Sequence, residues 1–189
     1  MRIQPPVFKT SRLILKPVSI TDIPAYQKYF VDFEVIRFLS SAVPWPYPEN
    51  GVEYFLENLI LPRQGIDRWC FGIYLQTKPD ELIGCVDLWR EPRPENRGFW
   101  LGRPFWGQGL MTEAVGPVTE YAFSELGFDV LYFSNALGNL ASRRVKEKSG
   151  ATLLGIRPAS FVSSEFTEAE LWELKKEKWM ESKRIISEF

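Results

Sequence analysis

Apolar side chains recur along the chain with two periods, and these periods predict a mixed order of strands and helices. Short apolar runs bounded by turn residues are typical of strands. They cover residues 12–17, 69–75, 82–89, 97–101, 130–134 and 152–158. Apolar residues three and four positions apart are typical of one helix face. This spacing covers residues 21–30, 33–39, 49–61, 112–127 and 141–149. The order indicates a mixed α/β sheet with helices on its faces.

Local signals refine the boundaries of the central elements. Residues 78–80, Lys-Pro-Asp, predict the turn between the second and third strands. Thr112 is expected to cap the central helix and Gly127 to end it. Pro117 lies inside that helix and has no amide hydrogen, so it should kink the helix and leave the carbonyl of Glu113 free.

The tail supports two different predictions. Residues 167–170, Thr-Glu-Ala-Glu, form a capping-box pattern, which favours a helix from Thr167 onward. Trp172 and Leu174 alternate with charged residues, which favours a strand. Both interpretations stay open from the sequence.

Composition and charge indicate one globular domain over residues 1–189. Hydrophobic residues make up 45% of the chain and aromatic residues 15%, enough for a sizeable core. The net charge of −1 predicts no general attraction to nucleic acid or to an anionic membrane. The chain holds no apolar run near eighteen residues, and residues 1–6 lack the apolar centre of a signal peptide, so a cytoplasmic location is expected.

The residue types that are missing or rare narrow the chemistry. The chain has no histidine, which excludes Ser-His-Asp and Cys-His catalysis and makes a zinc site improbable, so no metal is expected. Acid–base steps must then use carboxylates, hydroxyls, amines or water. Cys70 and Cys85 lie in strand-like apolar runs and are expected to be small buried hydrophobes.

A glycine loop runs directly into the central helix at Trp106-Gly-Gln-Gly-Leu-Met-Thr-Glu113. Gly107 and Gly109 carry no side chains, so the amides of residues 107–112 can point at a ligand, and a helix N-terminus favours anions. The loop lacks the Lys-Ser/Thr of a phosphate-binding P-loop and the third glycine of the dinucleotide fingerprint. Taken alone, the loop is better explained as a tight strand-to-helix turn.

This loop follows a Phe-Trp-Leu-Gly strand and precedes Asn-x-x-Ser-x-x-Val-x-Glu-Lys-x-Gly at residues 139–150, and together these motifs resemble the GNAT acetyltransferases. The branch most similar is the one typified by ribosomal-protein N-terminal acetyltransferases, the RimJ/RimL-like branch. The resemblance extends from Thr10 to Trp179. It implies a central, mostly antiparallel twisted sheet of six to seven strands, helices on both faces, and a splayed strand pair at the cofactor site.

The resemblance also implies a cosubstrate, acetyl-CoA, and the residues that hold it. The pyrophosphate would lie on the amides of Trp106, Gly107, Gln108, Gly109, Leu110, Met111 and Thr112. Leu101 and Arg103 would form main-chain bonds to the pantetheine arm, as an added strand would. The amide of Leu101 would polarise the thioester carbonyl. Asn139 would contact the cofactor arm, and a substrate amine would attack the thioester directly.

The general acid and the general base each have more than one candidate. Where many relatives carry a tyrosine as the acid for the leaving thiolate, this chain has Lys146; Ser142 is the candidate acid, and it also fits a helix N-cap. Asn96 stands where relatives often have a glutamate. Asp87, inside an apolar strand, is the candidate base, although it also fits a hydrogen-bonded structural carboxylate, and a chain of waters could replace it. Glu113 is expected to serve the helix start.

Trp45 and Tyr47 lie on a proline-rich loop and are assigned to the acceptor pocket. The leading hypothesis is therefore an N-acetyltransferase that acts on a primary amine, which could be a protein N-terminus, an amino acid or a small-molecule amine. The alternatives are a non-catalytic acyl-CoA-binding module and a nucleotide-binding protein unrelated to coenzyme A. The sequence does not choose between a monomer and a homodimer.

Overall fold

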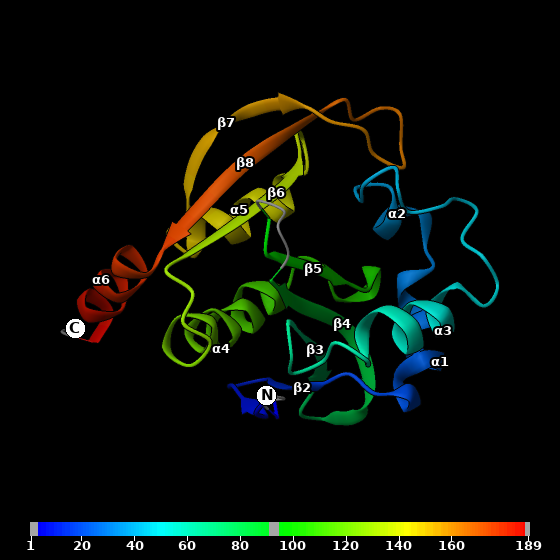
Figure 1. Ribbon diagram of the computed structural model, residues 1–189, viewed down its shortest axis with the longest axis horizontal. Helices are drawn as coiled ribbons and strands as arrows, with labels where there is room; N and C mark the ends of the chain where they lie inside the picture. Colours follow the sequence, from blue (N-terminus) through cyan, green and yellow to red (C-terminus); the bar gives the residue numbers. More distant parts are fainter. Residues whose placement is uncertain (1–3, 91–94, 188–189) are drawn as a thin grey trace.

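The computed structural model describes residues 4–90 and 95–187 (Figure 1). Its strands form two antiparallel sheets. The five-stranded sheet has the order β1-β2-β3-β4-β5, and the three-stranded sheet has the order β6-β8-β7. The strands are β1 (Phe8–Lys9), β2 (Leu13–Pro17), β3 (Arg68–Leu75), β4 (Lys78–Trp89), β5 (Arg97–Leu101), β6 (Val130–Ala136), β7 (Thr152–Pro158) and β8 (Glu168–Lys175).

Helices occupy the connections between these strands. The longer ones are α1 (Ile23–Phe30), α4 (Leu110–Ser124), α5 (Leu140–Lys148) and α6 (Lys176–Ser187). Shorter segments are η1 (Ile20–Asp22), α2 (Phe33–Ile36), α3 (Gly51–Phe55), the π-helical turn η2 (Leu56–Ile60) and the 3-10 turn η3 (Arg103–Phe105). Among the residues described, no helix has both the length and the apolar character needed to cross a membrane.

The two sheets meet at the start of β5 and then separate. The Asn96 amide donates to the Tyr132 carbonyl at 3.0 Å, and the Tyr132 amide donates to the Asn96 side-chain oxygen at 2.7 Å. Beyond these two bonds, β5 and β6 belong to different sheets, and Figure 1 draws those sheets as separate ribbons. The predicted mixed α/β fold with a splayed strand pair is confirmed, although the described residues form eight strands in two sheets rather than six to seven in one.

The five-stranded sheet is covered on both faces because its strands alternate apolar side chains to either side. On β3, Trp69, Phe71 and Ile73 pack into the cluster that contains α4, whereas Cys70 and Tyr74 pack into the cluster that contains α1 and α3. This two-sided burial explains why β3 reads as a continuous apolar run. Cys70 is free and 2% exposed, as is Cys85, so the prediction of small buried hydrophobes is confirmed.

Several predicted boundaries were wrong. The β3–β4 turn is at Gln76 and Thr77, two residues before the predicted Lys-Pro-Asp turn. Helix α4 begins at Leu110 after a left-handed Gly109, so Thr112 is not its cap. The helix continues through Pro117, and the kink there stays a prediction.

In the tail, the strand prediction is confirmed and the capping box at residues 167–170 is overridden. β8 pairs with β6 on one side and β7 on the other, and such pairing outweighs a local helix signal. Only after Lys175 does the chain turn into α6, which the sequence patterns did not predict; nor did they predict β1.

Candidate functional site

The glycine loop between η3 and α4 forms a backbone cradle. Gly107 and Gly109 both have φ of +74°, a left-handed conformation that costs other residues about 1–2 kcal/mol. A Cβ at Gly107 would meet nothing within 4 Å, so this glycine is required by its backbone conformation and leaves open space in front of the loop.

Six consecutive amides of this loop are left without a protein acceptor. The Trp106 amide donates to the Arg103 carbonyl at 3.2 Å, and the Glu113 amide donates to the Gly109 carbonyl at 3.1 Å. Between them, the amides of residues 107–112 have no acceptor among the described residues. They point from the start of α4, the positive end of its dipole. Six of the seven predicted phosphate-binding amides are therefore available, while that of Trp106 is used within the loop.

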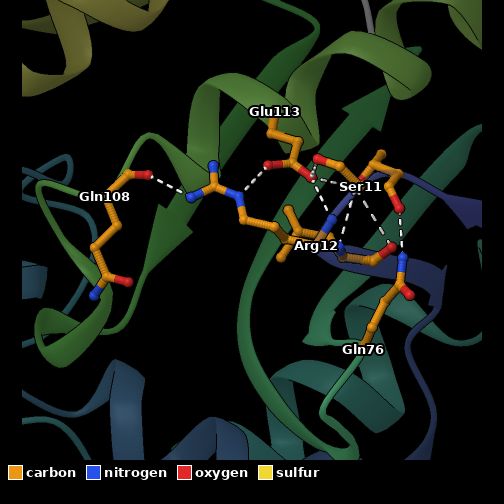
Figure 2. A network of polar contacts seen from close by, with 7 residues as sticks. Ser11, Arg12, Gln76, Gln108 and Glu113 are labelled. Carbon is orange, nitrogen blue, oxygen red and sulfur yellow. Dashed lines mark hydrogen bonds and ion pairs between the residues drawn. The ribbon is translucent and has the colours of Figure 1, made fainter.

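A salt-bridge network holds the cradle to the start of β2, as Figure 2 shows. The carboxylate of Glu113 accepts from Thr10 Oγ1 at 2.6 Å, Ser11 Oγ at 3.0 Å, and the Arg12 amide and Nε at 2.9 and 2.7 Å. Arg12 Nη1 then donates to the Gln108 carbonyl at 2.9 Å. Burial by itself would raise the pKa of Glu113, but these donors lower it to about 2.

The network ties Glu113, in the first turn of α4, to residues 10–12 rather than to the amides of the helix start, and it shows that sequence reasoning missed the role of Arg12. The arginine and the loop carbonyl that it holds are 96 residues apart in the chain. The only available signal was the Thr-Ser-Arg run at residues 10–12, which the pattern of apolar residues does not connect with the loop.

The end of β5 lines the gap where β5 and β6 diverge, which we call the splay. The Gly102 amide donates to the Ile83 carbonyl at 2.8 Å, so the alternation of an antiparallel ladder directs the amide and carbonyl of Leu101 away from β4, toward the splay. The Leu101 carbonyl accepts from Trp106 Nε1 at 2.6 Å. The Leu101 amide faces the gap between the sheets, and its predicted contact with a ligand stays a prediction.

Arg103 lies just beyond the end of β5 at Leu101. Its predicted main-chain bond to the pantetheine arm stays a prediction. Arg103 begins the 3-10 turn η3, and its carbonyl accepts the Trp106 amide. The proline that follows it favours this turn, because proline fixes φ at a value that suits the first turn of a helix.

The start of α5 carries the asparagine and serine singled out by the sequence. Asn139 Oδ1 accepts from the Ser142 amide at 3.1 Å, so Asn139 is the N-cap and the interpretation of Ser142 as the cap was wrong. The Ser142 hydroxyl accepts instead from Lys146 Nζ at 2.6 Å. Lys146 is 1% exposed.

Asp87 lies on β4 in an ion pair with Arg68 of β3. Its Oδ2 accepts from Arg68 Nη2 at 2.6 Å and from Nε at 3.0 Å, and both side chains are 15% exposed. This arrangement matches the alternative interpretation of Asp87 as a hydrogen-bonded carboxylate. Asn96, in the position where relatives often have a glutamate, is used to close the base of the splay.

The two aromatic residues of the proline-rich loop pack on different neighbours. Trp45 is 42% exposed and packs its ring on Phe33, with centroids 5.2 Å apart. Tyr47 packs edge-on against Phe30 at 5.5 Å, and burial raises its pKa. Trp45 thus presents an exposed ring, whereas Tyr47 is partly absorbed into the core beside α1.

Two other features help to define the site. A cavity of about 880 Å³ lies on the side of α4 near Phe8, Pro117 and Tyr121, more than a turn beyond the glycine loop. This cavity does not coincide with the free amides of residues 107–112. The candidate site is therefore identified by its unpaired amides and not by the position of a cavity. In the described part of the chain, no group of three or more Cys, Asp or Glu side chains could hold a metal ion.

Comparisons with known proteins show the family and the fold of this chain. The family model described as an acetyltransferase (GNAT) domain matches residues 12–152. The chain is 28% identical over 158 residues to FsC-acetyl coenzyme A-N(2)-transacetylase of Aspergillus fumigatus, covering 78% of this chain and 65% of that protein. It spans only about half the length of two further relatives from Bacillus subtilis, 51% and 54%.

Solved structures share the fold. The ribosomal L7/L12 α-N-protein acetyltransferase RimL, in complex with coenzyme A, superposes with a TM-score of 0.74 at 20% identity, covering 90% of this chain and 98% of that one. The spermidine N-acetyltransferase of Vibrio cholerae, in complex with coenzyme A and spermine, gives 0.75 at 16% identity, covering 90% and 99%.

Proposed function

This chain belongs to the GNAT acetyltransferase family, and on that premise we propose that it transfers an acetyl group from acetyl-CoA directly to a primary amine. The observation that carries the proposal is the run of six amides, residues 107–112, without a protein acceptor at the positive end of α4. Such donors suit a pyrophosphate, because each charge-assisted hydrogen bond contributes about 1.5–3 kcal/mol.

The roles of the remaining residues follow from their geometry. Acetyl-CoA would supply the activated acyl group. The Leu101 amide, directed into the splay, would hold the thioester carbonyl and stabilise the negative charge that develops on it. Asn139 uses its side-chain oxygen for the helix cap, which leaves its NH₂ group to donate to the pantetheine arm. The Ser142 hydroxyl would protonate the leaving sulfur.

Asp87 is the side chain that we favour as the base that deprotonates the amine. Glu113 is unsuited, since its pKa of about 2 makes its carboxylate a weak base. We assign the role to Asp87 or to water held near it, with Arg68 orienting the carboxylate. The variant Asp87→Asn should lower kcat/KM and remove an acidic limb from its pH profile if Asp87 accepts the proton. An unchanged profile would assign the role to water.

The acceptor is a small-molecule amine or a protein N-terminus. The comparisons support both classes, since the relatives named above include a transacetylase, a ribosomal-protein acetyltransferase and a spermidine acetyltransferase. The RimJ/RimL-like branch is the one we favour. The exposed ring of Trp45 is the surface we propose for acceptor contact, with Tyr47 beside it.

Calorimetric titration with acetyl-CoA, coenzyme A and ATP tests the proposal. Both coenzyme A forms should bind, and ATP should bind more weakly, because it lacks the pantetheine arm that the edge of β5 would pair with. A screen of amines by thiol release would then identify the acceptor class. Absence of acetyl-CoA binding would refute the proposal, because the free amides would then be only a turn.

A further inference from the structure

Lys146 is buried over the splay between the two sheets. It lies on α5, one helical turn after Ser142, and its Nζ is 5.2 Å from the ring centre of Phe99 on β5 and 5.8 Å from that of Phe133 on β6. Its single hydrogen-bond partner within the described chain is Ser142 Oγ, at 2.6 Å. The amine is therefore held between the two diverging strands and is joined to the residue proposed to protonate the leaving sulfur.

The carboxylates near Lys146 are paired with other side chains and do not form an ion pair with its amine. The charged side chains that act on it from the surrounding elements are Arg97, Glu95 and Glu170. Both carboxylates are engaged elsewhere: Glu170 pairs with Arg143 at 2.9 Å, and Glu95 pairs with Arg157 at 3.1 Å. Burial, together with the repulsion from the Arg97 guanidinium, lowers the pKa of Lys146 well below its usual value.

A purely structural role does not account for a lysine at this position. A buried amine without a carboxylate partner destabilises the fold, whereas a methionine of similar length would fill the same space between two phenylalanine rings. Its hydrogen-bond partner in the described chain, Ser142 Oγ, lies at the i, i+4 spacing that aligns side chains on one helix face.

We propose that Lys146 is a positioning residue for Ser142, which holds the serine hydroxyl toward the leaving sulfur and restores its proton. The inference rests on the proposed function, and it concerns a residue that stands where many relatives have a tyrosine.

The proton balance of this step closes. When the carbon–sulfur bond breaks, the sulfur keeps the electron pair and takes the proton of Ser142 Oγ–H. Ser142 Oγ takes a proton from the Lys146 ammonium, which becomes a neutral amine. Solvent returns one proton to Lys146, which balances the proton that the acceptor amine releases. The net products are the amide and the free thiol.

The test compares Lys146→Met with Lys148→Met, an exposed lysine on the same helix, and reads the pKa of the thiol of bound coenzyme A. Thiolate formation can be followed by ultraviolet absorbance across a pH series. A nearby ammonium stabilises a thiolate. Wild type and Lys148→Met should therefore hold the thiol pKa below that of free coenzyme A, and Lys146→Met should raise it by about one unit, a tenfold change in the ionisation constant.

Two further readouts separate this role from a structural one. Lys146→Met should unfold at a higher denaturant concentration than wild type, because a buried amine has been replaced by an apolar side chain. The kcat of Lys146→Met should fall. The decline in kcat at alkaline pH, which reports loss of the Lys146 proton in wild type, should disappear. In a Ser142→Ala background, Lys146→Met should add little further loss, since the two residues act through one hydroxyl.

The outcomes are distinct. If wild-type protein does not bind coenzyme A, the proposed function fails. If it binds but Lys146→Met leaves the thiol pKa and the pH profile unchanged, the inference about Lys146 is overturned while the proposed function stands. Loss of folding in Lys146→Met would also contradict the inference, because the lysine would then be a structural residue.

Discussion

The substitution Glu113→Gln tests whether the network between β2 and α4 holds the glycine cradle. Gln has nearly the same shape, but it removes the negative charge that accepts from Thr10, Ser11 and Arg12. The NH₂ group of the glutamine would also face the Arg12 guanidinium. Both groups are hydrogen-bond donors, so they cannot bond each other. The variant should be less stable and should bind coenzyme A more weakly, since Arg12 also holds the Gln108 carbonyl.

The magnitude follows from the pKa. A shift from 4.5 in the unfolded chain to about 2 in the fold corresponds to about 3 kcal/mol of stability at pH 7. The Arg12 side chain is 48% exposed, so solvent screening reduces the expected loss to about 1–2 kcal/mol. Because the folded pKa is the lower one, this stability is complete above the unfolded pKa and is lost as pH falls toward 2.

Urea denaturation of wild type and Glu113→Gln at a series of pH values measures this difference. The gap in the free energy of unfolding should be largest near pH 7 and should shrink by more than half by pH 3. Glu57→Gln, an exposed residue of η2, is the matched control and should differ from wild type by less than about 0.5 kcal/mol. A gap that is constant with pH, or no gap at all, would refute the reasoning.

Three further predictions concern single residues. Gly107→Ala and Gly127→Ala both place a Cβ in open space at positive φ, so each should lose about 1 kcal/mol by denaturation, but only Gly107→Ala should weaken coenzyme A binding in calorimetry; equal affinities would exclude the loop as the site. Asn139→Ala removes the cap of α5 and should lower the free energy of unfolding by about 1 kcal/mol, and an unchanged value would contradict the capping role. Cys70 and Cys85 should not react with a thiol reagent until the protein unfolds, and rapid labelling of native protein would show that they are not buried.

Local patterns predicted the features that depend on neighbouring residues. The left-handed glycines and the free amides follow from the loop and the helix start, since both are properties of adjacent backbone units. The same holds for the run of apolar residues in β3 and for the Asn139 motif that opens α5. The prediction that the cofactor-binding loop lies at residues 106–112 needed no contact from elsewhere in the chain, although its Trp106 amide is used internally.

Long-range pairing decided what the local patterns could not. The capping box at residues 167–170 gives way to a strand, because β8 gains hydrogen bonds on both edges from β6 and β7. The division into two sheets likewise depends on Asn96, whose side chain occupies the Tyr132 amide at the base of the splay. Neither outcome can be predicted from the residues adjacent to those positions.

The sequence by itself determined that this chain carries a glycine loop with free amides at a helix start and two-sided apolar strands, because these features need only short-range geometry and the sorting of apolar from polar side chains. Only the tertiary structure decided that Arg12 locks the cradle, that Asp87 is ion-paired with Arg68, and that Lys146 is buried against Ser142. A charged side chain acquires its protonation and its partner from the groups packed around it, and those groups come from segments far apart in the chain.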